Sequence, residues 1–257
     1  MSIDIRNVSF SYDKKRKILD DISLFINDST VNVLLGLNGC GKTTLIKAMA
    51  GLFRHYDGEI LYDGEKLSSL SYRERSKIVA YVPQTFYGTD DVLVGDYLTF
   101  GTVNSFRFYE LPKKEQLDKV YDISEKMHIS TLLNKKLGEI SGGERQTVCL
   151  CASLLQDSKV ILLDEPTSVL DLKNQNLILT TLKNIAEQER RIIVLSSHNP
   201  NHALFLGGNV ALMHHGKIIE YGNAQDIVCV SKLKQVYGEN ICLSEELNYK
   251  EISFCSV

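Results

Sequence analysis

Residues 36–44 have the sequence Gly36-Leu37-Asn38-Gly39-Cys40-Gly41-Lys42-Thr43-Thr44, which matches the pattern GxxxxGK[ST]. The stretch follows an apolar run at residues 31–35 and precedes residues 44–51, which favour a helix that ends at a glycine. A strand, a glycine-rich loop and a helix N-terminus in this order direct backbone N–H groups and a helix dipole toward one point. The order predicts a phosphate-binding loop.

This loop supplies the first candidate ligands. Lys42 is expected to reach the β- and γ-phosphates of a nucleotide, and the Thr43 hydroxyl is expected to ligate Mg²⁺. A glycine-rich turn with a solvated lysine is the alternative, but the flanking strand and helix favour phosphate binding. The candidate nucleotide-binding residues of the loop are Asn38, Gly39, Cys40, Gly41, Lys42, Thr43 and Thr44.

An acidic pair, Asp164-Glu165, ends the apolar run at residues 160–163. The carboxyl ends of parallel strands form the ligand-binding edge of α/β sheets, and adjacent strand residues point to opposite sides. We therefore expect Asp164 to organise Mg²⁺ and Glu165 to act as the base or water-orienting group at the γ-phosphate. Taken alone, an acidic pair after a strand more often lies in an exposed loop without a catalytic role. The presence of the phosphate loop in the same chain favours the catalytic interpretation.

The pattern of strands and helices predicts an α/β fold. Apolar runs typical of strands begin near residues 3, 22, 31, 59, 79, 160, 192, 210 and 218, and a turn at residues 13–17 separates the first two. Residues 86–158 are mainly helical, with Leu117, Val120 and Met127 at helical spacing. Strands that alternate with helices imply a largely parallel sheet, here interrupted by a helical insert.

Composition excludes several classes of protein. The 257 residues carry 29 Lys and Arg against 32 Asp and Glu, so the net charge of −3 gives no general attraction to nucleic acid. No apolar run approaches the roughly 20 residues of a membrane span. The first residues lack a secretory signal, which predicts a cytoplasmic protein. The six cysteines lack CxxC spacing and are expected to be reduced structural thiols.

Residues 140–146 introduce a second helix N-terminus. Ser141 and Glu144 have the spacing of a capping box, and Gly142 and Gly143 leave the first N–H groups of the helix accessible to an anion. An ordinary helix cap is the alternative. Because the chain already has one phosphate loop, two phosphate-binding ends suggest a shared nucleotide, and residues Ser141, Gly142, Gly143 and Glu144 become candidate nucleotide ligands.

Together these motifs resemble the ABC ATPases, whose LSGGQ signature is approximated by residues 140–144. In that family two nucleotide-binding domains pair head to tail, and ATP lies between one phosphate loop and the partner's signature helix. The resemblance implies a P-loop NTPase core with a mixed, largely parallel sheet, an N-terminal antiparallel β subdomain and an inserted α-helical subdomain. It also implies ATP and Mg²⁺ as cofactors.

The same resemblance suggests how residues 1–257 are divided within a single nucleotide-binding domain. Residues 1–85 and 159–240 would form the ATP-binding core with its β subdomain. Residues 86–158 would form the helical signature subdomain, and residues 241–257 a C-terminal tail.

Further family positions are matched one by one. Tyr12 resembles the aromatic residue that stacks on adenine, with ordinary strand packing as the alternative. Gln84 resembles the Q-loop glutamine, which senses Mg²⁺ and communicates with the membrane partner. Asp171, in Ser168-Val169-Leu170-Asp171, resembles the D-loop aspartate, and His198 resembles the switch histidine at the γ-phosphate. The resemblance thus assigns catalytic roles to Gln84, Glu165 and His198.

The sequence departs from the family pattern at a few positions. Ile140, Glu144 and Val169 replace the usual leucine, glutamine and alanine, and Thr147 stands where arginine is common. Cys40 occupies a phosphate-loop position where serine or alanine is usual. A thiol at a helix start beside Lys42 is expected to be reactive, so its alkylation should block nucleotide binding.

Related classes fit less well. Only residues 45–140, 96 positions, separate Thr44 from Ser141, too few for the coiled coil of chromosome and DNA-repair ATPases. Translation-factor ATPases carry two cassettes, and a second motif set is absent. A small GTPase needs an NKxD motif, which residues 134–137 lack.

A transport ATPase therefore fits best. It would act as a homodimer on transmembrane permease subunits, peripheral on the inner face of the membrane, and would serve a substrate-binding protein indirectly. Residues 198–203 and 236–238 resemble importers of iron siderophores, haem and cobalamin. Another importer or exporter class and a non-transport ABC ATPase are the alternatives. A permease helix is expected near residues 84–100, which otherwise form a surface loop.

Overall fold

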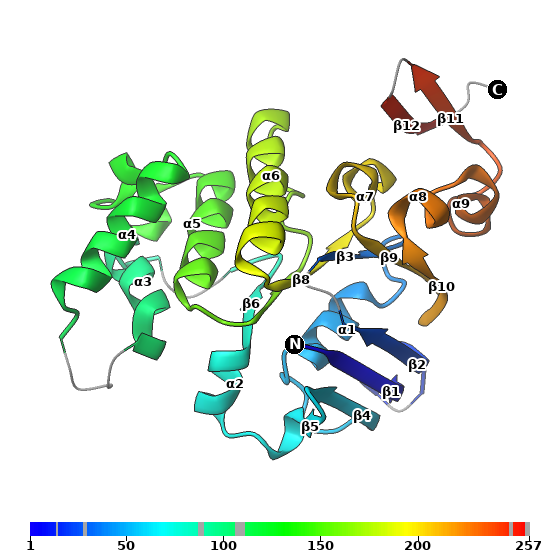
Figure 1. Ribbon diagram of the computed structural model, residues 1–257, viewed down its shortest axis with the longest axis horizontal. Helices are drawn as coiled ribbons and strands as arrows, with labels where there is room; N and C mark the ends of the chain where they lie inside the picture. Colours follow the sequence, from blue (N-terminus) through cyan, green and yellow to red (C-terminus); the bar gives the residue numbers. More distant parts are fainter. Residues whose placement is uncertain (14, 28–29, 87–89, 106–110, 247–248, 255–257) are drawn as a thin grey trace. The chain divides into compact units, whose positions relative to one another are not determined.

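The computed structural model describes the whole chain except residues 14, 28–29, 87–89, 106–110, 247–248 and 255–257 (Figure 1). The chain forms two compact units. The first contains Met1–Ser69 and Leu182–Val257, and the second contains Leu70–Thr181.

An antiparallel sheet opens the first unit. Its strands are β1 (Ile3–Phe10), β2 (Leu19–Ile26), β4 (Asp57–Tyr62) and β5 (Glu65–Lys66), in the order β2-β1-β4-β5 (Figure 1). Alternate residues of β2 are buried, as the period of a half-buried strand requires. This sheet is the antiparallel β subdomain that the sequence predicts.

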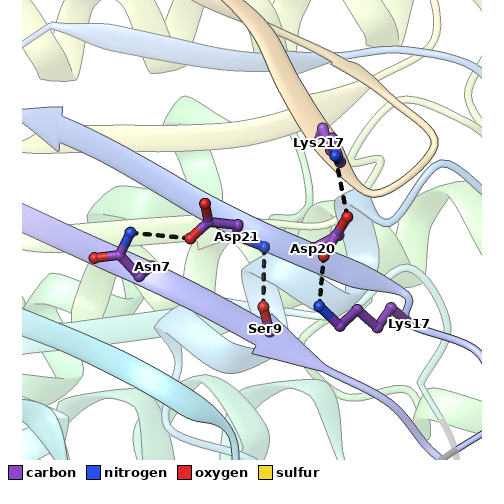
Figure 2. Close-up of polar contacts among 6 residues, drawn as sticks. All are labelled: Asn7, Ser9, Lys17, Asp20, Asp21 and Lys217. Atoms are coloured by element: carbon purple, nitrogen blue, oxygen red, sulfur yellow. Dashed lines mark hydrogen bonds and ion pairs between the residues drawn. The ribbon is translucent and has the colours of Figure 1, made fainter.

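A pair of bulges interrupts β1 and β2. Asn7 and Asp21 have φ angles of 49° and 57°, and the β1–β2 register shifts beside them. The Asn7 amide donates to Asp21 Oδ1 at 2.9 Å, and the Asp21 N–H donates to Ser9 Oγ at 2.9 Å (Figure 2). Asparagine and aspartate tolerate the left-handed conformation better than other side chains, so these residues suit the bulge. The bulges explain why the buried positions of β1 change from Ile3 and Ile5, which alternate, to Val8, three residues further on.

A mixed, largely parallel set of strands completes the first unit. Strand β3 (Val31–Leu35) pairs in parallel with β8 (Ile192–Ser197) and β9 (Asn209–His214), and β10 (Lys217–Asn223) pairs antiparallel with β9. All five residues of β3 are buried, as expected for a strand covered on both faces. Helices α1 (Lys42–Met49) and α7 (Pro200–Leu206) follow β3 and β8.

The second unit is mainly helical. Strands β6 (Val79–Val82) and β7 (Val160–Leu163) pair in parallel. The helices are α2 (Tyr72–Ile78), α3 (Val94–Gly101), α4 (Lys114–Lys126) and α5 (Gly142–Leu155), and α6 (Leu172–Glu189) leads back into the first unit. Short 3₁₀ turns cover Leu67–Ser69 in the first unit and Thr102–Ser105, Ser130–Leu132 and Leu137–Glu139 in the second.

The buried face of helix α4 differs at one position from the apolar face that the sequence predicts. Val120 and Met127 are buried as expected, whereas Leu117 is 50% exposed. Gln116 is buried instead, because its side-chain oxygen accepts a hydrogen bond from the Lys113 N–H at 3.0 Å and caps the helix. A polar residue thus takes a buried position in order to satisfy the helix N-terminus.

After β10 the chain forms α8 (Ala224–Ile227) and α9 (Val230–Tyr237). The expected C-terminal tail, residues 241–257, contains a hairpin of β11 (Ile241–Glu246) and β12 (Tyr249–Phe254) (Figure 1). None of the helices within the described ranges is long and apolar enough to span a membrane. The five cysteines in those ranges are free thiols.

Candidate nucleotide-binding site

The phosphate loop lies between β3 and α1 and folds around the Lys42 side chain. Lys42 is only 4% exposed, and its Nζ donates to Gly36 O at 2.8 Å and to Leu37 O at 3.0 Å. Gly39 and Gly41 have φ angles of 78° and 111°, which only glycine adopts readily. The loop therefore holds an ammonium group beneath a backbone that can direct N–H groups at an anion.

A turn between β9 and β10 supports this loop from behind. The Gly216 N–H donates to Cys40 O at 2.9 Å, and the Asp20 N–H donates to Gly216 O at 2.9 Å. Gly216 has a φ of +78°, and a Cβ there would lie 2.5 Å from Ile18 O. Only glycine fits a backbone approach this close. Gly216 is not among the residues predicted from the sequence, although a glycine between two strand patterns is a recognisable signal of a hairpin turn.

One ion pair joins the start of β10 to β2, and a second, local pair shares the same carboxylate. The Asp20 carboxylate accepts from Lys17 Nζ at 2.7 Å and lies 3.1 Å from Lys217 Nζ (Figure 2). These hydrogen bonds, first from Lys17 and then from Lys217, hold the pKa of Asp20 below its ordinary value. Both pairs are exposed, so the backbone bonds through Gly216 carry more of the support.

Tyr12 lies beside the start of α1. Its ring is 62% exposed, and its hydroxyl is 3.5 Å from Thr44 Oγ1. Phe10 and Phe53 meet the ring edge-on, with centroids 4.9 Å and 5.9 Å away. Such an exposed ring beside the phosphate loop disagrees with simple strand packing and suits a stacking role, which stays a prediction.

In the second unit the acidic pair follows β7, as predicted. Asp164 is 1% exposed, and its N–H continues the strand pairing by donating to Val82 O at 2.9 Å. Glu165 has a φ of +45°, a conformation that is uncommon for a residue with a side chain. Gln84 Nε2 donates to Glu165 Oε2 at 3.2 Å. The structure thus brings together two of the three predicted catalytic residues.

The N-terminus of α5 has the predicted capping box. Ser141 Oγ accepts from the Glu144 N–H at 3.2 Å, and Glu144 Oε2 accepts from the Ser141 N–H at 2.7 Å. The bond from the Ser141 N–H to the carboxylate, followed by one from the Ser141 side chain, holds the pKa of Glu144 below its ordinary value. A Cβ at Gly142 would meet nothing within 4 Å, whereas one at Gly143 would lie 3.2 Å from Leu170 Cδ2. Gly143 therefore serves packing inside the chain, and Gly142 does not.

The departure at Thr147 has a local consequence. The Thr147 hydroxyl donates to Gly143 O at 3.1 Å, so the side chain turns back onto its own helix. Nearby, Arg145 forms an ion pair with Asp90. A cation one turn inside the signature helix is thus present at position 145.

The two remaining predicted residues lie near helix starts. Asp171 Oδ1 accepts from the Asn174 N–H at 2.8 Å and caps α6, a local role that the sequence analysis did not anticipate. His198 is exposed directly after β8, and its backbone oxygen accepts from the Tyr237 hydroxyl at 3.0 Å.

The predicted site residues divide between the two units. Tyr12, residues 38–44 and His198 belong to the first unit. Gln84, Asp164, Glu165, residues 141–144 and Asp171 belong to the second. Within the described ranges there is no group of three or more His, Cys, Asp or Glu that could hold a metal ion.

Comparison with known proteins identifies the family. The ABC transporter family model matches residues 19–168, more than half of the chain. A probable iron chelatin transport ATP-binding protein of Helicobacter pylori is 33% identical over 202 residues, which cover 78% of this chain and 79% of that protein.

Solved structures agree on the fold. An inward-facing, putative metal-chelate type ABC transporter matches with a TM-score of 0.80 at 23% identity, covering 98% of this chain and 96% of that one. A dimeric ATP-binding cassette bound to ADP and Pi matches with a TM-score of 0.78 at 21% identity, covering 86% and 98%. The chain therefore belongs to the ABC transporter family, of which it is an ATPase.

Proposed function

We propose that this ATPase drives import of a metal chelate, as a head-to-tail homodimer bound to permease subunits on the inner face of a membrane. The iron chelatin transport described for the Helicobacter pylori relative and the metal-chelate type of the similar transporter structure support this substrate class. The permease would in turn receive its cargo from a substrate-binding protein. A single nucleotide-binding domain, with the helical insert at residues 86–158 and a tail from residue 241, is part of the same proposal.

The open surroundings of Gly142 are the main structural support for the proposed dimer. Among the described residues, no atom lies within 4 Å of the position that a Cβ at Gly142 would take, so no packing contact there accounts for a glycine at the start of the signature helix. Exposed N–H groups at a helix start bind anions, and a glycine lets a phosphate approach them closely. The dimeric architecture of the related cassette supports a second copy as the source of that phosphate.

The residues of the site suggest a division of labour. Lys42 would leave the carbonyls of Gly36 and Leu37 and donate to the β- and γ-phosphates. Glu165 would accept a proton from the attacking water, and His198 would donate to the γ-phosphate. Tyr12 would stack on adenine, and Asp171 would reach the partner subunit across the dimer.

Mg²⁺ fits the donors that this chain offers. Thr43, Gln84 and Asp164 provide a hydroxyl, a carboxamide oxygen and a nearly fully buried carboxylate, which are the hard oxygen ligands that Mg²⁺ prefers. These residues would hold the ion, which would supply positive charge to offset the phosphates.

Dimerisation is tested with the Glu165→Gln variant, which should bind ATP without cleaving it. Light scattering should show twice the monomer mass with ATP and the monomer mass without it. The Lys42→Ala, Glu165→Gln double variant is the matched control and should stay monomeric. A monomer at saturating ATP in the presence of the permease contradicts the dimer.

The substrate class is tested by uptake. Cells that lack this chain should regain uptake of a labelled ferric siderophore when the natural chain is supplied, and not when Glu165→Gln is supplied. Restored uptake of molybdate or a polyamine, with none of the iron chelate, would contradict the substrate class and leave the ATPase assignment intact.

A further inference from the structure

The end of α9 is bonded to the segment that carries His198. The Tyr237 hydroxyl donates to the backbone oxygen of His198 at 3.0 Å. Tyr237 is half-buried, and its burial raises the pKa of its hydroxyl, so the group is a neutral donor at any physiological pH. The hydrogen bond therefore persists across the working range of the enzyme.

The C-terminal hairpin reaches the same segment by a second route. Asn201 Nδ2 donates to Ile252 O at 3.2 Å, and Asn201 Oδ1 accepts from the Ile252 N–H at 2.8 Å. The amide side chain thus pairs with β12 as a neighbouring strand would, satisfying both polar backbone groups of Ile252. Ile252 itself is buried, and β12 packs on α7.

Short-range bonds make the His198–Asn201 stretch a rigid unit. Ser197 Oγ accepts from the Asn199 N–H at 3.0 Å, and Asn199 Oδ1 accepts from the Asn201 N–H at 3.0 Å. Pro200, the first residue of α7, fixes its own φ. A displacement of the hairpin at Asn201, or of α9 at Tyr237, is therefore transmitted to the backbone at His198.

We propose that α9 and β12 position His198 for its contact with the γ-phosphate, with Tyr237 and Asn201 as the positioning residues. This inference rests on the proposed role of His198. The exposed His198 side chain projects from a backbone that the Tyr237 hydroxyl holds, so the position of that backbone limits where the imidazole can reach. Preorganised donors matter because the enzyme does not spend reorganisation energy during the reaction.

The test uses Tyr237→Phe in the full chain, which removes one hydroxyl and little volume. Loss of one hydrogen bond predicts that kcat for ATP hydrolysis falls about fivefold, while the Kd for ATP stays unchanged. Tyr221→Phe is the matched control, since the Tyr221 hydroxyl donates to Asn32 Oδ1 at 3.0 Å in the same unit. The Tyr221→Phe variant should be destabilised to a similar extent, and its kcat should equal that of the natural chain.

A spectroscopic readout separates positioning from general destabilisation. The ring NMR signals of His198, assigned through His198→Ala, should shift in Tyr237→Phe and in Asn201→Ala but not in Tyr221→Phe. Asn201→Ala should also lower kcat, because it releases β12. Natural kcat together with unmoved His198 signals in both positioning variants would overturn the inference.

The same variants distinguish the proposed role of His198 from the proposed positioning role of Tyr237 and Asn201. If His198→Ala hydrolyses ATP at the natural rate, the switch role of His198 is wrong and the positioning role falls with it. If His198→Ala is inactive while Tyr237→Phe and Asn201→Ala match the natural chain, only the positioning role is overturned.

Discussion

Gln84 and Glu165, 81 positions apart in the sequence, are joined by a hydrogen bond of 3.2 Å from Nε2 to Oε2. The residue proposed to sense Mg²⁺ therefore contacts the residue proposed to activate water. The same carboxamide donates its N–H to Glu165 and would offer its oxygen to a metal, so binding at Gln84 would be coupled to catalysis at Glu165.

The first prediction concerns charge at this contact. Gln84→Glu places a second carboxylate beside Glu165, and like charges disfavour ionisation of both. The acidic limb of the kcat pH profile should therefore move to higher pH. Gln84→Met, similar in volume and uncharged, is the control and should leave that limb in place. An unmoved acidic limb in Gln84→Glu would show that Glu165 is not the titrating base.

The second prediction concerns the turn behind the phosphate loop. Gly216→Ala adds a Cβ that would lie 2.5 Å from Ile18 O and forces the backbone bond to Cys40 to shift. Small misplacements of binding groups are costly, so ATP should bind at least about tenfold more weakly in isothermal titration. Gly64→Ala is matched in φ, at +84°, but its Cβ would meet nothing within 4 Å. Equal ATP affinities in the two variants would contradict the support role.

The third prediction concerns the pH dependence of stability. The pKa of Glu144 is lowered from 4.5 by the hydrogen bonds of the capping box, so its contribution to stability is full above about pH 4.5. It is lost as the pH falls through the lowered value. The stability of Glu144→Gln, measured by circular dichroism, should therefore be lower at neutral pH and should fall less steeply than that of the natural chain as the pH drops below about 4.5. If the stability of the variant depended on pH as that of the natural chain does, the stabilising role of the capping box would be contradicted.

The fourth prediction concerns Cys40. The Cys40 side chain is buried, and its backbone oxygen is held by Gly216. The sequence predicts a reactive thiol at the helix start, and the burial of the side chain corrects that expectation. Labelling by maleimide should therefore be slow, should be slowed further by ATP and should abolish ATP binding once complete. Cys40→Ser should bind ATP and resist the reagent, with mass spectrometry accounting for the other cysteines. Full ATPase activity after stoichiometric labelling at Cys40 would refute this.

Local signals in the sequence identified much of the fold. The run at residues 160–163 corresponds to β7 residue for residue, and the capping box at Ser141 begins α5 as predicted. Both depend on neighbours in the sequence, where periodicity and spacing are informative.

Long-range contacts account for what the sequence did not reveal. The bond between Gln84 and Glu165, the approach of Gly216 to Ile18 and the pairing of Asn201 with Ile252 join distant parts of the chain. The β11–β12 hairpin was missed because its polar, weakly alternating residues carry little strand signal and its stability comes from contacts with α7 and α9. Tertiary packing overrides local preference at such positions.

Cross-linking across the dimer tests the central claim most directly. Two populations of the Glu165→Gln chain, with native cysteines replaced by serine, would carry Asn38→Cys or Gly142→Cys, so that any disulfide in their mixture joins two chains. The account predicts that ATP brings the phosphate loop of one copy to the signature helix of the other and yields the mixed cross-link. Absence of this product at saturating ATP, when both variants bind the nucleotide, would contradict it.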